Sequence, residues 1–200
     1  MNTLRAILSC LSLLLLLLAP PVLHDARAGG GAHVYSVRRE DSHIGFMIRK
    51  WLVIKEEGRF RDFTGTITYD PALPHKTMVE FVIQAASIDS RNEDRDKALR
   101  STEFFDVGRF PTLSFRSTVT VSPENGLLVT GNLTIRGVTR QVTVPVQVNG
   151  VTSVGTIGEI AGFESTFTIK RLDFGVARGW DILGNDVVIT LQIGASGSGC

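Results

Sequence analysis

Residues 113–121 read Leu-Ser-Phe-Arg-Ser-Thr-Val-Thr-Val, and this alternation decides the fold class. Leu113, Phe115 and Val119 are apolar, whereas Ser114 and Arg116 between them are polar. Successive side chains of a β-strand point to opposite faces, so the pattern predicts a strand with one buried and one hydrated face. Strands of this kind are typical of antiparallel sheets, since buried parallel strands carry continuous apolar runs.

The same period of two recurs along the chain and is punctuated by turn signals. Arg136-Gly137 is a candidate two-residue hairpin loop, and Pro123–Gly126 a candidate tight turn. Pro145 interrupts an alternating stretch, which indicates an edge or a bulge. We therefore expect an all-β antiparallel domain of about eight strands, either a closed barrel or a sandwich. Other alternating stretches are residues 44–48, 79–83, 142–148, 163–170 and 187–193.

One segment departs from the strand pattern and predicts a short helix inserted near residues 91–106. Ser90-Arg91-Asn92-Glu93 matches a capping box with Ser90 as the N-cap, and good helix formers follow over residues 94–99.

The N-terminal residues have the pattern of an export signal. Arg5 precedes an apolar run over residues 7–19, which is too short to span a bilayer, and Ala26-Arg27-Ala28 fits a signal peptidase site. We expect residues 1–28 to be a cleaved signal peptide and the protein to be periplasmic or secreted. Residues 29–194 would form one domain, and residues 195–200 a flexible Gly/Ser tail that ends in cysteine.

The composition excludes several classes of protein. Lys and Arg total 21 against 20 Asp and Glu, so a protein that binds nucleic acid by neutralising phosphates is not expected. Removal of the signal peptide leaves Cys200 as the single cysteine, which precludes an internal disulfide. We expect a monomer, or a dimer linked through Cys200 in an oxidising compartment.

Motifs for catalysis or metal binding are absent from the sequence. Outside the predicted signal peptide, the three histidines His33, His43 and His75 show no metal-ligand spacing, and the sequence has neither a nucleophile elbow nor a phosphate loop. The acidic residues of 89–106 could form a carboxylate pair or a solvated helix face. We therefore predict no metal, no cofactor and no catalytic residue.

The apolar face of the alternating strands is nearly free of charge. In a barrel of about eight strands, such a face either packs solid or surrounds one apolar ligand. The periodicity does not distinguish these two cases.

Several ordered motifs between Val34 and Ile193 resemble the YceI-like family of exported polyisoprenoid-binding or lipid-binding proteins. The motifs are Ser42–Phe46, Gly58–Gly65, Arg95–Asp106, Phe110-Pro111, Phe115–Ser117, Gly131–Thr139, Gly162-Phe163, Asp173–Gly175 and Leu183–Val187.

This resemblance implies a lipocalin-like closed barrel with an elongated apolar channel that binds a long isoprenoid or a similar lipid without catalysis. We also expect transient contact with a membrane. We expect Arg49 and Lys50 to contact a polar head group near the mouth of the channel. Residues expected to line the channel are Phe46, Ile48, Ile67, Phe81, Ile83, Leu113, Phe115, Leu133, Val144, Phe167, Ile169 and Leu191.

Two other functions stay open at this stage. One is a stress-related structural or interaction module with a packed core. The other is an enzyme that acts on an isoprenoid, which would need two ionisable side chains on the inner face, where the alternation places almost none.

Overall fold

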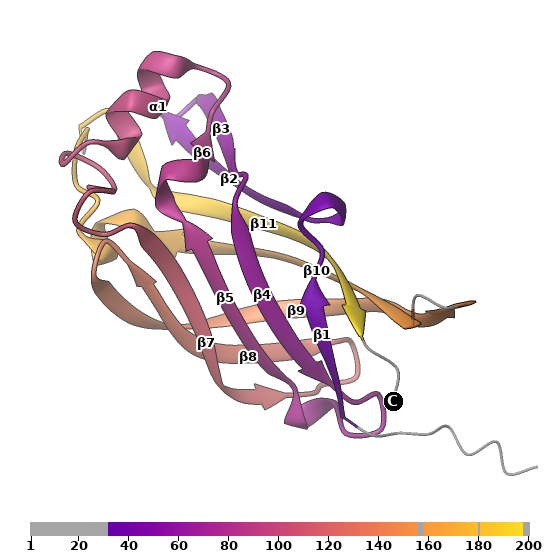
Figure 1. Cartoon of the computed structure of the whole chain (residues 1–200). Coiled ribbons are helices and arrows are strands. Elements are labelled where there is room, and N and C mark those ends of the chain that lie inside the picture. Colours follow the sequence, from indigo (N-terminus) through magenta and orange to yellow (C-terminus); the bar gives the residue numbers. More distant parts are fainter. Residues whose placement is uncertain (1–31, 156–157, 180, 198–200) are drawn as a thin grey trace, which may run out of the picture.

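The computed structural model describes residues 32–155, 158–179 and 181–197 and confirms the predicted closed antiparallel barrel (Figure 1). Eight strands pair in the order β1-β4-β5-β7-β8-β9-β10-β11, and β11 closes the ring by pairing with β1. The barrel strands are β1 (His33–Val37), β4 (Phe63–Tyr69), β5 (Met78–Gln84), β7 (Thr112–Val121), β8 (Leu127–Ile135), β9 (Val138–Val154), β10 (Gly158–Lys170) and β11 (Leu183–Gly197).

Three further strands extend the sheet from residues 183–192 of β11. Strand β2 (His43–Lys50) pairs with β11, β3 (Ile54–Phe60) pairs with β2, and β6 (Ile88–Asp89) pairs with β3. The α-helix α1 (Glu93–Arg100) follows β6. Short 3-10 helices connect other strands: η1 (Arg39–Asp41), η2 (Pro74–Lys76), η3 (Ala85–Ser87) and η5 (Arg171–Phe174).

The barrel has two ends that differ in what covers them. Helix α1, the β2–β3 loop (residues 51–53) and the β8–β9 hairpin loop (residues 136–137) lie at one end, which we call the α1 end (Figure 1). At the far end, Tyr35 is fully buried and Tyr69 packs edge-to-face on Phe163, with ring centroids 5.9 Å apart. None of the helices in the described part of the chain has both the length and the apolar character needed to cross a membrane.

The β8–β9 connection is the predicted two-residue hairpin. Arg136 and Gly137 have φ angles of 51° and 72°, the pair of positive values that a type I′ turn requires. A Cβ atom on Gly137 would lie 2.5 Å from the Phe110 ring. Glycine is therefore needed here both for its backbone conformation and for the close approach of Phe110.

Helix α1 falls within the predicted segment, but the predicted N-cap is wrong. The side chain of Asn92, not Ser90, accepts the hydrogen bond from the backbone N–H of Arg95. Ser90 is buried, and both its hydroxyl and its backbone N–H donate to Asp96, at 2.6 and 2.8 Å. Burial at the end of β6 commits Ser90 to Asp96, so Asn92 caps the helix instead.

The predicted C-terminal boundary at residue 194 is too early. Residues 195–197 belong to β11 and pair with β1, and Ala195 is completely buried. At residue 197 a glycine fits closely, since a Cβ atom there would lie 3.0 Å from the Tyr35 ring. The predicted signal peptide and Cys200 lie outside the described residues, so both stay predictions.

Candidate functional site

The barrel encloses a cavity of about 140 Å³ that only apolar atoms face. Its lining extends from Phe60, near the α1 end, to Phe163, near the far end. An engineered cavity of roughly 150 Å³ lined by Leu, Ile and Phe stays dry and binds benzene. The interior of this barrel is therefore neither solid nor wide, and its chemistry suits an apolar guest rather than water.

Eleven of the twelve residues expected to line a channel do line this cavity. They are Phe46, Ile67, Phe81, Ile83, Leu113, Phe115, Leu133, Val144, Phe167, Ile169 and Leu191. Ile48 does not line it. In the β2–β3 ladder Ile48 lies opposite Glu56, which forms an ion pair with Arg95 of α1. After Phe46, the inner face of β2 therefore no longer lines the cavity and lies beside Glu56 instead.

The cavity has further lining residues that the prediction did not name. Except for Phe60 of β3, they occupy inward positions of the strands that carry the predicted residues, so the alternation that found the others also marks them. Among them are Ile44, Phe60, Val79, Leu127, Val129, Ile135, Val142, Val146, Phe163, Ile189 and Ile193.

Three phenylalanines of the lining lie over glycines of neighbouring strands. A Cβ atom on Gly65, for example, would lie 2.8 Å from the Phe81 ring. Each glycine lets an aromatic ring lie flat against the wall, an arrangement that also covers the exposed backbone of the glycine. The three pairs are Phe46–Gly58, Phe81–Gly65 and Phe115–Gly131.

One side of the cavity lies against a seam where two barrel strands separate. The β9–β10 ladder ends at Gln147 and Glu164 in the described pairings, and beyond it the Ser165 hydroxyl donates to the Pro145 carbonyl at 2.5 Å. At this point Pro145 thus pairs only with β8. This agrees with the sequence, where a proline inside an alternating stretch indicates an edge. Val144 lines the cavity beside this seam.

Ionisable side chains on the inner face lie at the two ends of the barrel and not in the cavity. At the far end Glu159 accepts a hydrogen bond from Tyr35 at 2.8 Å and lies 3.1 Å from His33. Burial, followed by this bond to Glu159, raises the pKa of Tyr35. Glu56 lies at the α1 end. Sequence reasoning missed both carboxylates, and their separation at opposite ends offers no carboxylate pair for catalysis.

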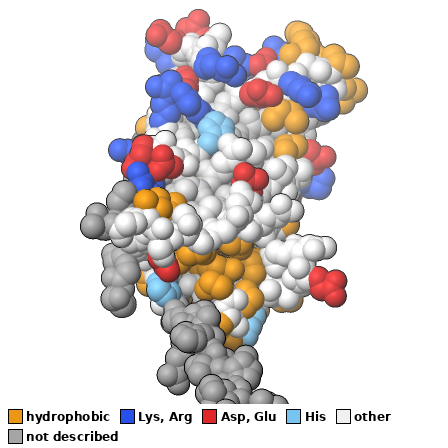
Figure 2. Space-filling view, turned by 90° about the vertical axis from the view of Figure 1, so that its right-hand side faces the viewer, with side chains coloured by type: hydrophobic (Ala, Val, Ile, Leu, Met, Phe, Trp, Pro, Cys, Tyr) orange, Lys and Arg blue, Asp and Glu red, His pale blue; other side chains and the backbone are white. Residues whose placement is uncertain are grey.

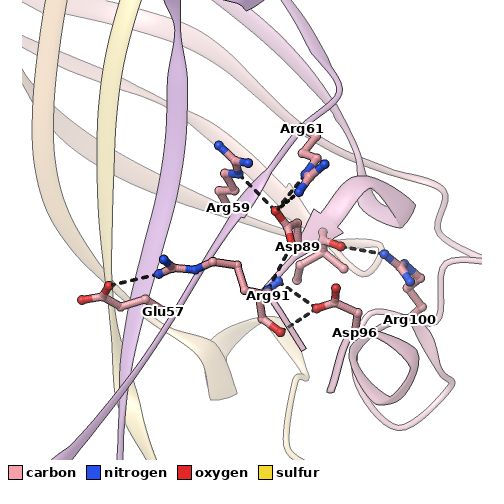
Figure 3. A network of polar contacts seen from close by, with 9 residues as sticks. Glu57, Arg59, Arg61, Asp89, Arg91, Asp96 and Arg100 are labelled. Atoms are coloured by element: carbon pink, nitrogen blue, oxygen red, sulfur yellow. Dashed lines mark hydrogen bonds and ion pairs between the residues drawn. The ribbon is translucent and has the colours of Figure 1, made fainter. Parts of the chain in front are cut away.

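A charge network fastens β6 and α1 to β3 (Figure 3). Asp89 accepts hydrogen bonds from Arg61 at 2.7 Å, from the backbone N–H of Arg91 at 3.0 Å and from Arg59 at 3.1 Å. The Arg61 hydrogen bond is the main reason why the pKa of Asp89 falls to about 2. Acidic residues of this segment thus hold the α1 end together.

A buried guanidinium organises the loop that follows η5. Arg171 is 5% exposed, and burial lowers its pKa. The charge is stabilised because all three nitrogens donate to backbone carbonyls rather than to an acid. Those carbonyls belong to Val176, Arg178, Gly179, Leu183 and Gly184.

The two residues expected to contact a head group do not line the cavity. Arg49 is exposed near the end of β2, and the Lys50 Nζ lies 4.5 Å from the centroid of the Trp51 ring. Within the described ranges, no three His, Cys, Asp or Glu side chains gather in a way that could hold a metal ion.

Topology and cavity together define an antiparallel barrel with an apolar interior. Residues 35–195 match the family model of the YceI-like domain, and the chain belongs to this family. A UPF0312 protein of Pseudomonas paraeruginosa is 35% identical over 165 residues, which cover 80% of this chain and 84% of that relative. Protein YceI of Salmonella arizonae is 34% identical over 163 residues, or 82% and 81% of the two chains.

Solved structures share the fold. The crystal structure of BcnA from Burkholderia cenocepacia has a TM-score of 0.72 and 27% identity, and the match covers 80% of this chain and 99% of that chain. A polyisoprenoid binding domain from Saccharophagus degradans has a TM-score of 0.66 and covers 82% of this chain and 98% of its own. At 15% identity, the second likeness concerns the fold alone.

Proposed function

We propose that this protein binds the chain of one apolar lipid, such as a polyisoprenoid, inside the barrel and carries or stores it without catalysis. The observation that carries the proposal is the cavity, which only apolar atoms face. Burial of each ligand methylene contributes about 0.8 kcal/mol, so a chain of several isoprene units offsets the cost of association. The polyisoprenoid binding domain among the structural neighbours has the same architecture.

A long chain needs more room than the unliganded cavity offers. At interior packing density a carbon atom occupies roughly 20 Å³, so the cavity of about 140 Å³ holds about seven carbons, little more than one isoprene unit. Longer ligands require widening, and the seam between β9 and β10 is where the wall yields. Among the described residues, the hydrogen bond from the Ser165 hydroxyl to the Pro145 carbonyl spans the seam where ladder pairs end.

The proposal places this binding outside the cytoplasm. The N-terminal export signal supports a periplasmic or secreted protein. A carrier there would keep an apolar chain out of water between membranes or enzymes. Arg49 and Lys50 would reach the polar head of a ligand only if it left the barrel at the α1 end.

Titration with a fluorescent polyprenyl probe tests the proposal. Leu133→Asp and Val144→Asp each place a carboxylate on the inner face, at a cost of several kcal/mol, and should abolish binding. Thr143→Asp is the matched control, because Thr143 points outward and is exposed. Circular dichroism checks that each variant folds. Equal binding by the parent and both inner-face variants would show that the probe does not occupy the cavity.

A further inference from the structure

The loop between β2 and β3 exposes consecutive apolar side chains at the α1 end. Trp51, Leu52 and Val53 are 58%, 83% and 74% exposed, and Ile54 beside them is 43% exposed. Single exposed apolar residues are ordinary, but four in succession on a projecting loop form a patch that water solvates poorly. We call residues 51–54 the apolar tip.

The backbone of the apolar tip is unusual for the residues it holds. Trp51 and Leu52 have φ angles of 48° and 65°, in the left-handed region that normally favours Gly or Asn. Hydrogen bonds from the Trp51 N–H to the Ile182 carbonyl and from the Val53 N–H to the Lys50 carbonyl, at 2.8 and 3.3 Å, hold this shape. The loop thus places large apolar side chains at positions where small polar residues would cause less backbone strain, which indicates that these side chains have a function.

Cationic side chains flank the apolar tip on both strands. Arg49 and Lys50 precede it and Lys55 follows it, and no acidic residue lies between positions 49 and 55. Lys50 packs over the Trp51 ring, so a charge and the aromatic side chain form one unit. Figure 2 shows hydrophobic side chains projecting beside Lys and Arg side chains at this end of the molecule.

We propose that the apolar tip docks on the surface of an anionic phospholipid bilayer. Apolar side chains would enter the interface between head groups and acyl chains, where tryptophan is favoured, while the three cations meet lipid phosphates. Charge complementarity selects this partner over a second copy of the chain, because pairing two such tips would bring cations together.

Docking of this kind would bring the cavity close to a membrane. Phe46, which lines the cavity, and the apolar tip are both carried by the β2–β3 hairpin. A lipid could then pass between bilayer and barrel over a short path. The docking itself rests on the tip alone and does not depend on what the cavity binds.

Flotation with vesicles tests the proposal. The parent protein should float with vesicles of phosphatidylcholine and phosphatidylglycerol in equal parts, and much less with phosphatidylcholine alone. Leu52→Asp should weaken vesicle binding by at least about tenfold. Lys50→Gln combined with Lys55→Gln should weaken it by roughly thirtyfold, since each cation near an anionic surface contributes a factor of about five.

Val121→Asp is the matched control, because Val121 is 56% exposed on β7 toward the far end and should float like the parent. Because Leu52 is highly exposed, Leu52→Asp should leave the fold intact. If Leu52→Asp misfolds, the double variant of Lys50 and Lys55 tests the proposal instead.

Failure of the parent to float on anionic vesicles would overturn the proposal. A dimer in sedimentation that Leu52→Asp abolishes, without vesicle binding, would also overturn it. Probe titration without vesicles should give the same affinity in the parent, Leu52→Asp and Val121→Asp, which separates docking from cavity binding.

Discussion

Replacement of Val144 by tryptophan should fill the cavity and block it without adding charge. Val144 is 6% exposed and lines the cavity beside the seam between β9 and β10. Tryptophan adds about seven heavy atoms at roughly 20 Å³ each, which nearly matches the cavity of about 140 Å³. The substitution therefore tests whether a ligand needs this volume.

The two expected effects have opposite directions. Mutational data relate cavity volume to stability at about 24 cal/mol per Å³, so filling the cavity could stabilise the fold by up to about 3 kcal/mol, less any rotamer strain. A ligand would lose burial of about seven carbons at about 0.8 kcal/mol each. Part of that loss is recovered if the ligand shifts, and an affinity decrease of at least about a hundredfold is expected.

Urea unfolding and titration with a fluorescent polyprenyl probe measure the two effects on the same variant. Thr143→Trp is the control, because it adds an indole to the outward face of the same strand. Val144→Trp that folds and binds the probe as tightly as the parent would refute the reasoning. Either the ligand would not occupy this part of the barrel, or the wall would widen at no measurable cost.

Two further predictions concern the α1 end. Asp89 has a pKa of about 2 in the folded protein, against 3.8 unperturbed, so its stabilising contribution is present above pH 3.8 and is lost as the pH falls toward 2. In Asp89→Asn, the free energy of unfolding measured with urea should depend less on pH across that window than in the parent. Asp186→Asn, which removes one partner of an exposed ion pair, should keep the pH dependence of the parent. An equal pH dependence in the parent and in Asp89→Asn would contradict this. Arg171→Met should lower the free energy of unfolding at neutral pH by at least about 3 kcal/mol, because buried carbonyls lose their hydrogen-bond donor. Arg140→Met, at an exposed position, should change the free energy of unfolding by no more than about 0.5 kcal/mol. Equal unfolding midpoints for these two arginine variants would show that the Arg171 network contributes nothing.

Alternation alone was sufficient to assign the inward face of most strands. A period of two leaves only two choices of face, and burial of the apolar one settles which is correct. Leu133 and Val144 were placed correctly in this way, and Gly137 with Arg136 marked the hairpin between their strands. The same rule failed at Ile48, because the period says which way a side chain points and not how far the cavity extends.

The shape of the cavity could not be predicted from the sequence. It depends on which residues face each other across strands, as when Phe81 lies over Gly65, and register is not visible in a single strand. Ala195 illustrates the same limit. Small residues at the C-terminus are typical of a flexible tail, yet the strand continues there because residues 195–197 pair with β1, with Ala195 opposite Val37 and Gly197 opposite Tyr35.

The most direct test of an apolar lipid in the barrel is extraction of the protein purified from the organism that produces it. Mass spectrometry of the organic extract should find a long apolar chain, near one molecule for each barrel, that is depleted in Val144→Trp purified in parallel. An extract free of any apolar chain, together with a parent protein that binds no polyprenyl probe, would contradict the account and favour a barrel whose interior serves only as a core.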